Sequence, residues 1–279
     1  MEGKSGSGVT KSSTRPAARA SDVIKKWTFA ANLSWLFQEW PFLDRFAAAA
    51  DAGFTAVEYL FPYDHAPGDI ARRLAAHGLK QVLFNLSPGD FAAGERGIAA
   101  LAGREEEFRA SVQTALNYAR ATGTPRLHLM AGIAAGEGAM ALYRDALKFA
   151  CEAAARDGIE IVIEPINGRD IPGYLMGDFG LAQRLIEDLR LPNLGLQFDI
   201  YHRQILHGDV TRGLQALLPI TRHIQVASVP LRQEPTTGEL DDARVFDTLT
   251  RLGYDGFVGC EYRPANGTLA GLGWMKRLS

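Results

Sequence analysis

Oxygen-bearing side chains recur where short apolar runs of this sequence end. The clearest case is Ile161-Val162-Ile163-Glu164, in which three β-branched residues predict a strand buried on both faces. Pro165 has no N–H to give to a sheet, so the strand should stop beside the carboxylate. An unpaired buried carboxylate is costly to desolvate, and positive charge is therefore expected next to Glu164.

Three later runs have the same form, at residues 194–199, 223–227 and 256–261. Four strands that end alike predict that their terminal side chains converge on one divalent cation. These side chains are Glu164, Asp199, Gln225 and Glu261. Because the set contains only oxygen ligands, it favours Mg²⁺ or Mn²⁺ over Zn²⁺. The alternative is four unrelated strand ends with solvated polar tips.

The elements that must position these side chains alternate along the chain from Trp27 onward. Strands are predicted at residues 27–32, 55–59, 80–85, 126–131, 161–164, 194–199, 223–227 and 256–261, with amphipathic helices between them. Eight such units predict a single closed TIM (β/α)8 barrel, in which the C-terminal ends of all strands lie on one face. Glu58 and Asn85 should reach the same face. An open doubly wound sheet is the alternative, but no glycine fingerprint follows the first strand.

Two segments depart from the regular alternation of strands and helices. Residues 87–104 form a long polar stretch with several glycines, which predicts a lid or an insertion near the site. Residues 268–277 leave room for only a short final helix. Residues 1–26 are rich in Ser, Gly, Ala and basic residues and are predicted to be a disordered extension of a barrel domain at 27–279. An organelle transit peptide is the less favoured interpretation of this extension.

Composition limits the class of partner. The chain has 279 residues, 47% of them hydrophobic, and a net charge of −2 with both signs interspersed, which fits one barrel domain and argues against nucleic acid or membrane binding. A small molecule is the expected partner, and a homo-oligomer is allowed. Cys151 and Cys260 are expected to be free thiols, which favours a cytoplasmic protein. No apolar run approaches the roughly 20 residues of a membrane span.

Six stretches of the sequence resemble motifs of the hydroxypyruvate isomerase family, a branch of the xylose-isomerase-like TIM barrels. They are FAANLS (29–34), VEYLFPYD (57–64), GERG (94–97), IEPIN (163–167), FDIYH (198–202) and GCEY (259–262). The resemblance extends from Trp27 to the C-terminus. The region from His223 to Glu239 is more similar to 2-oxo-tetronate isomerases than to hydroxypyruvate isomerases.

The resemblance implies that Glu164 and Glu261 are metal ligands and also the proton donor and acceptor of an isomerase, an intramolecular oxidoreductase. Such a reaction moves a carbonyl to the neighbouring carbon of a sugar acid through an enediolate. The resemblance also implies that His202 bonds a substrate hydroxyl, with a structural capping role as the alternative. The expected substrate is 2-oxo-tetronate, and hydroxypyruvate is the runner-up.

Other candidates follow from residue chemistry alone. Arg232 could bind the substrate carboxylate, since a guanidinium recognises carboxylates bidentately, or it could be a solvated loop charge. Glu58 could position a hydroxyl, orient a neighbour in the site or pair with an arginine. Cys260 should point away from the site because it alternates with Glu261 along the strand. Two other functions stay open, an AP-endonuclease-like metallonuclease and a non-catalytic sugar-acid-binding barrel.

Overall fold

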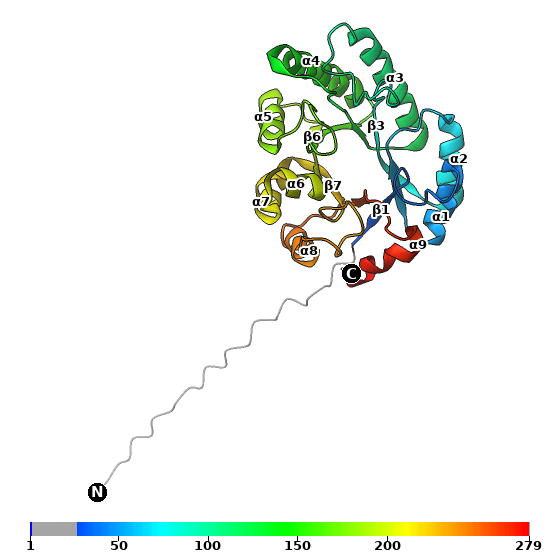
Figure 1. Cartoon of the computed structure of the whole chain (residues 1–279), viewed down its shortest axis with the longest axis vertical. Helices are drawn as coiled ribbons and strands as arrows, with labels where there is room; N and C mark the ends of the chain where they lie inside the picture. The colour runs from blue at the N-terminus through cyan, green and yellow to red at the C-terminus, as the bar shows by residue number, and fades with distance from the viewer. Residues whose placement is uncertain (2–26, 279) are drawn as a thin grey trace.

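The computed structural model describes Met1 and residues 27–278 of the chain. Within residues 27–278, eight parallel strands close into a barrel in sequence order (Figure 1). They are β1 (Phe29–Asn32), β2 (Ala56–Tyr59), β3 (Lys80–Asn85), β4 (Arg126–His128), β5 (Glu160–Ile163), β6 (Leu194–Asp199), β7 (Thr221–Val226) and β8 (Val258–Cys260). The predicted TIM barrel is confirmed, and all but one residue of the predicted extension, 1–26, lie outside the described part.

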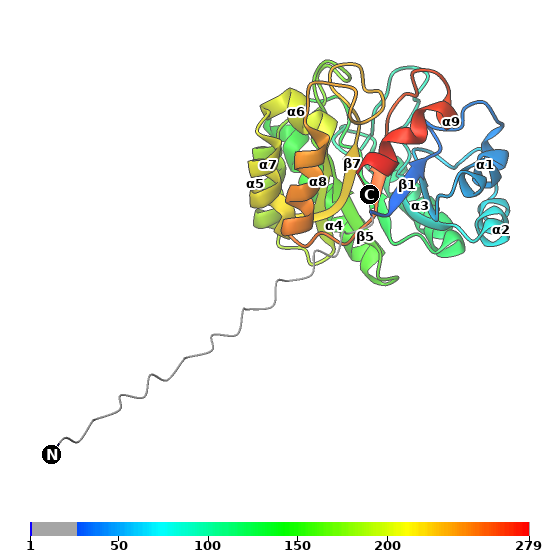
Figure 2. The same cartoon turned by 90° about the horizontal axis from the view of Figure 1, so that it is seen from below.

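Helices surround the barrel and cover its outer face (Figures 1 and 2). They are α1 (Arg45–Asp51), α2 (Pro67–His77), α3 (Glu105–Thr122), α4 (Gly136–Ala155), α5 (Phe179–Leu189), α6 (Ile200–His207), α7 (Val210–Leu217), α8 (Asp242–Arg251) and α9 (Thr268–Gly271). Short 3₁₀ turns precede α1, follow α7 and extend α9: η1 (Phe42–Asp44), η2 (Leu218–Ile220) and η3 (Leu272–Arg277). The final helix is short, as predicted.

Two elements differ from the sequence-based expectation. Helix α6 begins directly after Asp199, whose carboxylate accepts the backbone N–H groups of Tyr201 and His202 and so caps the helix. Strand β4 ends at His128 rather than at residue 131, because the N–H of Ala131 is donated to the Tyr174 hydroxyl instead of to a neighbouring strand. Both differences bring additional side chains to the C-terminal end of the barrel.

Side-chain alternation builds the barrel interior in layers. Ala30, Ala56 and Val162 belong to a small buried apolar cluster contributed by neighbouring strands. Two residues further along the same strands come Asn32, Glu58 and Glu164, which share the inward face because the strand period is two. The interior therefore changes from apolar to polar toward the C-terminal ends of the strands.

The larger apolar core lies between the strands and the surrounding helices, and it includes both cysteines. Cys260 is fully buried in this outer core, which confirms that it points away from Glu261. Both thiols are free. Among the described helices, none combines the length and the apolar character needed to cross a bilayer.

Candidate active site

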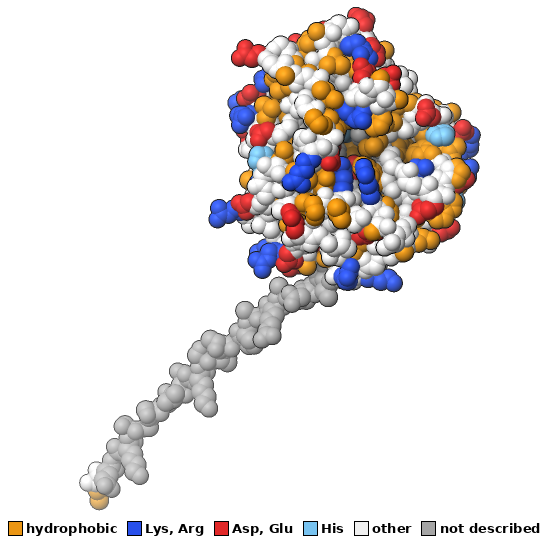
Figure 3. All heavy atoms as spheres, in the orientation of Figure 1, with side chains coloured by type: hydrophobic (Ala, Val, Ile, Leu, Met, Phe, Trp, Pro, Cys, Tyr) orange, Lys and Arg blue, Asp and Glu red, His pale blue; other side chains and the backbone are white. Residues whose placement is uncertain are grey.

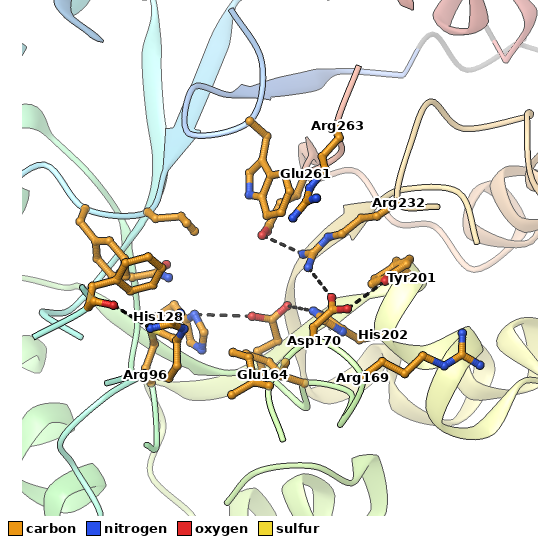
Figure 4. Close-up of a pocket in the computed structure, with 18 of the residues that line it drawn as sticks. Arg96, His128, Glu164, Arg169, Asp170, Tyr201, His202, Arg232, Glu261 and Arg263 are labelled. Carbon is orange, nitrogen blue, oxygen red and sulfur yellow. Dashed lines mark hydrogen bonds and ion pairs between the residues drawn. The ribbon is translucent and has the colours of Figure 1, made fainter. Parts of the chain in front are cut away.

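A cavity of about 460 Å³ opens at the C-terminal ends of the strands. Space filling shows basic side chains gathered around a hollow in this face (Figure 3). His128 comes from the end of β4, while Glu164 and Glu261 directly follow β5 and β8. Tyr201 and His202 enter from the first turn of α6 (Figure 4). The barrel thus brings residues from distant parts of the sequence to one wall.

Two buried carboxylate oxygens lie near His202. Oε1 of Glu164 and Oδ2 of Asp199 have no hydrogen-bond partner among the described residues. Each lies 3.9 Å from Nε2 of His202. Glu164, Asp199 and His202 can each offer one ligand atom, and these atoms lie within 4.8 Å of one another. Because a cation would satisfy both orphan oxygens, the arrangement fits a metal site.

The carboxylates of the site resist ionisation together. Burial raises the pKa of Glu164 well above its usual range, and the charges of Glu261 and Asp199 raise it further. Burial raises the pKa of Glu261 to about 8, against the opposing effect of Arg232. Burial also raises the pKa of Asp199, although Arg232 and two backbone N–H groups lower it. A proton or a cation is therefore stabilised between these groups.

Arg232 is the cation that lies among the carboxylates. Its guanidinium is 2.8 Å from Asp170 and 2.9 Å from Glu261 (Figure 4). It also lies 3.6 Å from Asp199, and its side chain is only 11% exposed. Burial lowers the pKa of this guanidinium, but the neighbouring carboxylates raise it more, so the charge is retained. The guanidinium also lies over the rings of Trp35 and Tyr201. Its Nε is buried with no hydrogen-bond partner among the described residues.

Two histidines face Glu164. Nδ1 of His128 lies 3.6 Å from Oε2 of Glu164, and neither ring nitrogen of His128 has a hydrogen-bond partner among the described residues. Burial lowers the pKa of His128 to about 3 and that of His202 well below its usual value. Both rings are therefore neutral near pH 7. His202 contacts Asn167 through its other nitrogen, Nδ1.

The structure places Gln225 and Glu58 in a buried hydrogen-bond network rather than on the cavity lining. Nε2 of Gln225 donates to Glu58 at 2.7 Å, and Oε1 accepts from Gln197 at 2.6 Å. Glu58 also accepts from Asn32 at 3.0 Å and lies 2.6 Å from His223. Glu58 thus orients the amide of Gln225, which is one of the roles that its sequence position suggested. No arginine pairs with Glu58 among the described residues.

Asn85 and the predicted lid reach the cavity from β3 and the connection after it. Asn85, Phe91 and Arg96 all line the cavity. The Arg96 guanidinium lies 3.8 Å from the centre of the Phe91 ring, and this ring contacts Phe61. The stretch 87–104 therefore borders the cavity, and its closure over a substrate stays a prediction.

Several residues of the site were not predicted from the sequence. His128 ends a strand as the predicted ligands do, so the same signal could have found it. Asn167 ends the IEPIN motif. Asp170, which pairs with Arg232 and accepts from the Tyr201 hydroxyl at 3.1 Å, lies in a loop without a local signal. The contacts of such a loop residue can be identified only in the folded barrel.

The closed barrel and the carboxylate-lined cavity at its C-terminal face define a TIM-barrel enzyme of the xylose isomerase-like class. The family model described as xylose isomerase-like TIM barrel matches residues 46–278. A 2-oxo-tetronate isomerase of Cupriavidus necator is 51% identical over 252 residues, covering 89% of this chain and 97% of that protein. A hydroxypyruvate isomerase of Escherichia coli is 42% identical over 251 residues, covering 88% and 97%.

The chain therefore belongs to the hydroxypyruvate isomerase family within this class of barrels. A crystal structure described as an AP endonuclease of family 2 from Brucella melitensis has a TM-score of 0.88 and 46% sequence identity, with coverage of 90% of this chain and 98% of that one. The isomerase names of the relatives confirm the prediction that the chain is an enzyme of this kind. They leave no basis for a non-catalytic barrel.

Proposed function

We propose that this protein is a metal-dependent keto-acid isomerase that interconverts 2-oxo-tetronate and 3-oxo-tetronate. The observation that carries the proposal is the pair Glu164 and Glu261, two buried carboxylates with raised pKa that line one cavity. The relative named 2-oxo-tetronate isomerase is 51% identical, against 42% for the relative named hydroxypyruvate isomerase. Conversion of hydroxypyruvate to tartronate semialdehyde is the alternative.

The reaction moves the carbonyl from C2 to C3 of the acid. One glutamate takes the proton from C3, which gives an enediolate, and a proton is returned at C2 while the hydroxyl proton passes from O3 to O2. Raised pKa values suit this work, because a group whose pKa lies near the working pH both accepts and releases protons readily. Arg232 binds the substrate carboxylate, and its unpartnered Nε supports this assignment.

The proposed ligands of the metal are Glu164, Asp199 and Glu261, with Gln225 as a fourth. This all-oxygen set supports Mg²⁺ or Mn²⁺. When bound, the cation would supply positive charge that stabilises the enediolate oxygens and acidifies the C–H bond. Oε1 of Glu164 and Oδ2 of Asp199 are buried without hydrogen-bond partners among the described residues, which supports this assignment.

His128 is the residue that we assign to the additional CHOH unit of the four-carbon acid. It is neutral, lines the cavity and has two ring nitrogens without partners among the described residues. A site built to bond a hydroxyl leaves a polar group unpaired when the shorter acid binds, and this mismatch can cost up to about 10⁴-fold in kcat/KM. The structure thus supports discrimination in favour of the tetronate.

The test is a panel of three- and four-carbon keto acids, assayed after chelation and again with Mg²⁺ or Mn²⁺ restored. We expect activity only with metal, and a higher kcat/KM for 2-oxo-tetronate than for hydroxypyruvate. His128→Ala should lower kcat/KM for the tetronate more than for hydroxypyruvate, while His128→Gln should retain part of the preference. Equal or better turnover of hydroxypyruvate by the unmodified protein would reject the tetronate assignment.

The description of the Brucella protein makes a metallonuclease the second candidate. In the described part of the chain, the side chains able to hold a metal form one group, of Glu164, Asp199 and His202. A nuclease that positions several metal ions would need a richer set of ligands than this single group. A duplex with an abasic site belongs in the assay panel, and its cleavage without any keto-acid isomerisation would overturn the isomerase proposal.

We also propose a cytoplasmic location. Cys151 and Cys260 are buried and free, which is the state expected in a reducing compartment.

A further inference from the structure

Asn167 directly follows Ile166, which lines the cavity, and contacts His202. It is fully buried, and its Oδ1 accepts the backbone N–H groups of Arg169 at 2.9 Å and Asp170 at 3.1 Å. Its Nδ2 lies 2.7 Å from Nδ1 of His202. The opposite orientation of the amide would direct its NH₂ group at two N–H donors. The local hydrogen bonds therefore determine that Asn167 presents a donor to the ring.

A second donor reaches the same ring nitrogen. The backbone N–H of Asn167 points at Nδ1 of His202 from 3.3 Å. Two donors can share one nitrogen only if that nitrogen carries a lone pair. Both the Nδ1–H tautomer and the doubly protonated ring are incompatible with this contact, since each has a hydrogen on Nδ1. The hydrogen of the neutral ring therefore lies on Nε2.

We propose that Asn167 is a positioning residue that fixes His202 as the Nε2–H tautomer, so that His202 acts as a hydrogen-bond donor in the site and not as a metal ligand. The substrate contact of this donor rests on the proposed isomerase function, whereas the tautomer does not. Metal-binding histidines normally donate their second N–H to a carboxylate or a carbonyl, which leaves the first nitrogen free for the metal. In this protein the partner of Nδ1 is itself a donor. Nδ1 is therefore the acceptor, and the hydrogen lies on Nε2.

The distances around Nε2 agree with a donor that awaits a ligand oxygen. Nε2 lies 3.9 Å from both Glu164 and Asp199, beyond hydrogen-bond range of either. A substrate hydroxyl or carbonyl oxygen placed between them would accept the Nε2–H. By side-chain type and distance alone, Glu164, Asp199 and His202 could all be metal ligands. If Nε2 of His202 carries a hydrogen, only Glu164 and Asp199 of this group can bind the metal.

The direct test is long-range ¹H–¹⁵N correlation of histidine rings in the full chain labelled with ¹⁵N-histidine. His202→Gln identifies the signals of His202. We expect a protonated Nε2 and an unprotonated Nδ1 between about pH 6 and pH 8. A spectrum with the proton on Nδ1 contradicts the proposal without the need for any variant of Asn167.

Asn167→Asp replaces the amide donor that faces His202 by a carboxylate acceptor of nearly the same shape. The carboxylate still accepts from Arg169 and Asp170, and its other oxygen now accepts a hydrogen from the ring. We expect the proton to appear on Nδ1 of His202. Asn85→Asp is the matched control, because it adds the same charge to the cavity lining at a different strand end. The control should leave the His202 spectrum unchanged, and the same spectrum for both variants would overturn the assignment to Asn167.

Metal affinity supplies a second readout. Asn167→Asp frees the Nε2 lone pair, and imidazole nitrogen favours Zn²⁺ over Mn²⁺. The ratio of Zn²⁺ to Mn²⁺ affinity, measured by titration calorimetry, should rise about tenfold or more in Asn167→Asp but not in Asn85→Asp. An unchanged ratio would contradict the exclusion of His202 from the ligands.

The two proposals fail separately. If the ring carries Nε2–H but no keto acid is isomerised, the proposed function is wrong and the tautomer assignment stands. If the protein isomerises keto acids but His202 carries Nδ1–H, the role of Asn167 is wrong. With both correct, Asn167→Ala should lower kcat by about 10- to 100-fold, as for other residues that orient a group of an active site, with a smaller effect on KM.

Discussion

At the scale of single residues, the carboxylates divide their oxygens between the protein and the cavity. Oδ1 of Asp199 caps α6, while Oδ2 has no hydrogen-bond partner among the described residues. Glu261 gives one oxygen to Arg232 at 2.9 Å. Fixing one oxygen sets the direction of the other, so these side chains are held ready for a ligand before it arrives.

The first prediction concerns the two glutamates. Glu164→Gln and Glu261→Gln should each lose about 10²- to 10⁴-fold in turnover, the range for general acid–base groups, because an amide neither accepts nor releases the proton. The measurement is kcat for keto-acid isomerisation at saturating metal. Metal content of each variant must be determined alongside, since lost metal would lower the rate for a different reason. Near-native turnover by either variant removes that residue from the mechanism.

The second prediction concerns Arg232. Arg232→Ala should raise KM for both acids by roughly 10- to 100-fold, as expected from the loss of a charge-assisted hydrogen bond to the substrate carboxylate. Arg232→Lys should recover only part of this loss, because an ammonium cannot bind a carboxylate bidentately. Steady-state kinetics with both acids gives the values. A lysine variant with native KM would show that charge alone is required.

At the scale of elements, the loops that follow the strands complete the cavity that begins at the strand ends. The base of the 87–104 stretch is held by backbone hydrogen bonds from Gly97 to Pro88 and from Ala100 to Ala131. Gly97 has φ of 112° and packs against the Met130 carbonyl, so a side chain there would not fit. The tip carries Phe91 at 44% exposure, and the N–H groups of Asp90, Ala93, Gly94 and Glu95 bond to acceptors within the tip itself.

The third prediction follows from this difference. If the stretch closes over the substrate, amides of residues 90–96 should become protected from hydrogen exchange when a non-reactive substrate analogue binds. Residues 97–101 should change little, because Gly97 and Ala100 are already bonded to Pro88 and Ala131, outside the tip. Exchange measured by mass spectrometry with and without the analogue tests this. Equal exchange at the tip in both states would show that it does not act as a lid.

At the scale of the whole molecule, the closed barrel buries more carboxyl groups than the single charge of Arg232 can neutralise. Glu164, Asp199 and Glu261 come from three strands, and burial raises the pKa of each. Binding of one cation by carboxylates from several strands would connect these strands and would relieve their mutual repulsion. Stability of the fold should therefore depend on both metal and pH.

The fourth prediction makes this dependence explicit. The pKa of Glu261 is raised from 4.5 to about 8 in the folded protein, so the folded state holds this proton more tightly than the unfolded state. The resulting stability is present below the unfolded pKa and is lost as pH rises through about 8. After chelation, Tm should fall between about pH 5 and pH 9, and less so in Glu261→Gln. The increase in Tm caused by Mn²⁺ should grow over the same range. Calorimetry showing a metal effect independent of pH would contradict this linkage.

The sequence by itself determined the barrel and most of its site. Period-two alternation, β-branched runs and strand-terminal carboxylates were sufficient to predict eight units and the positions of Glu164, Asp199 and Glu261. These features are local, because strand propensity and side-chain alternation depend on a few neighbouring residues. The capping signal of Asp199 is equally local, yet the strand-end pattern predicts only a ligand there and no helix over residues 200–207.

Only the tertiary structure decided how the polar groups share their partners. Gln225 and Glu58 lie near strand ends, as Glu164 and Asp199 do, and contacts with Asn32, Gln197 and His223 join them in a network inside the barrel. The pairing of Arg232 with Asp170 links residues 62 positions apart, and Asn167 meets His202 across 35. Hydrogen-bond partners at such separations depend on barrel closure and on strand register, which local sequence patterns do not encode.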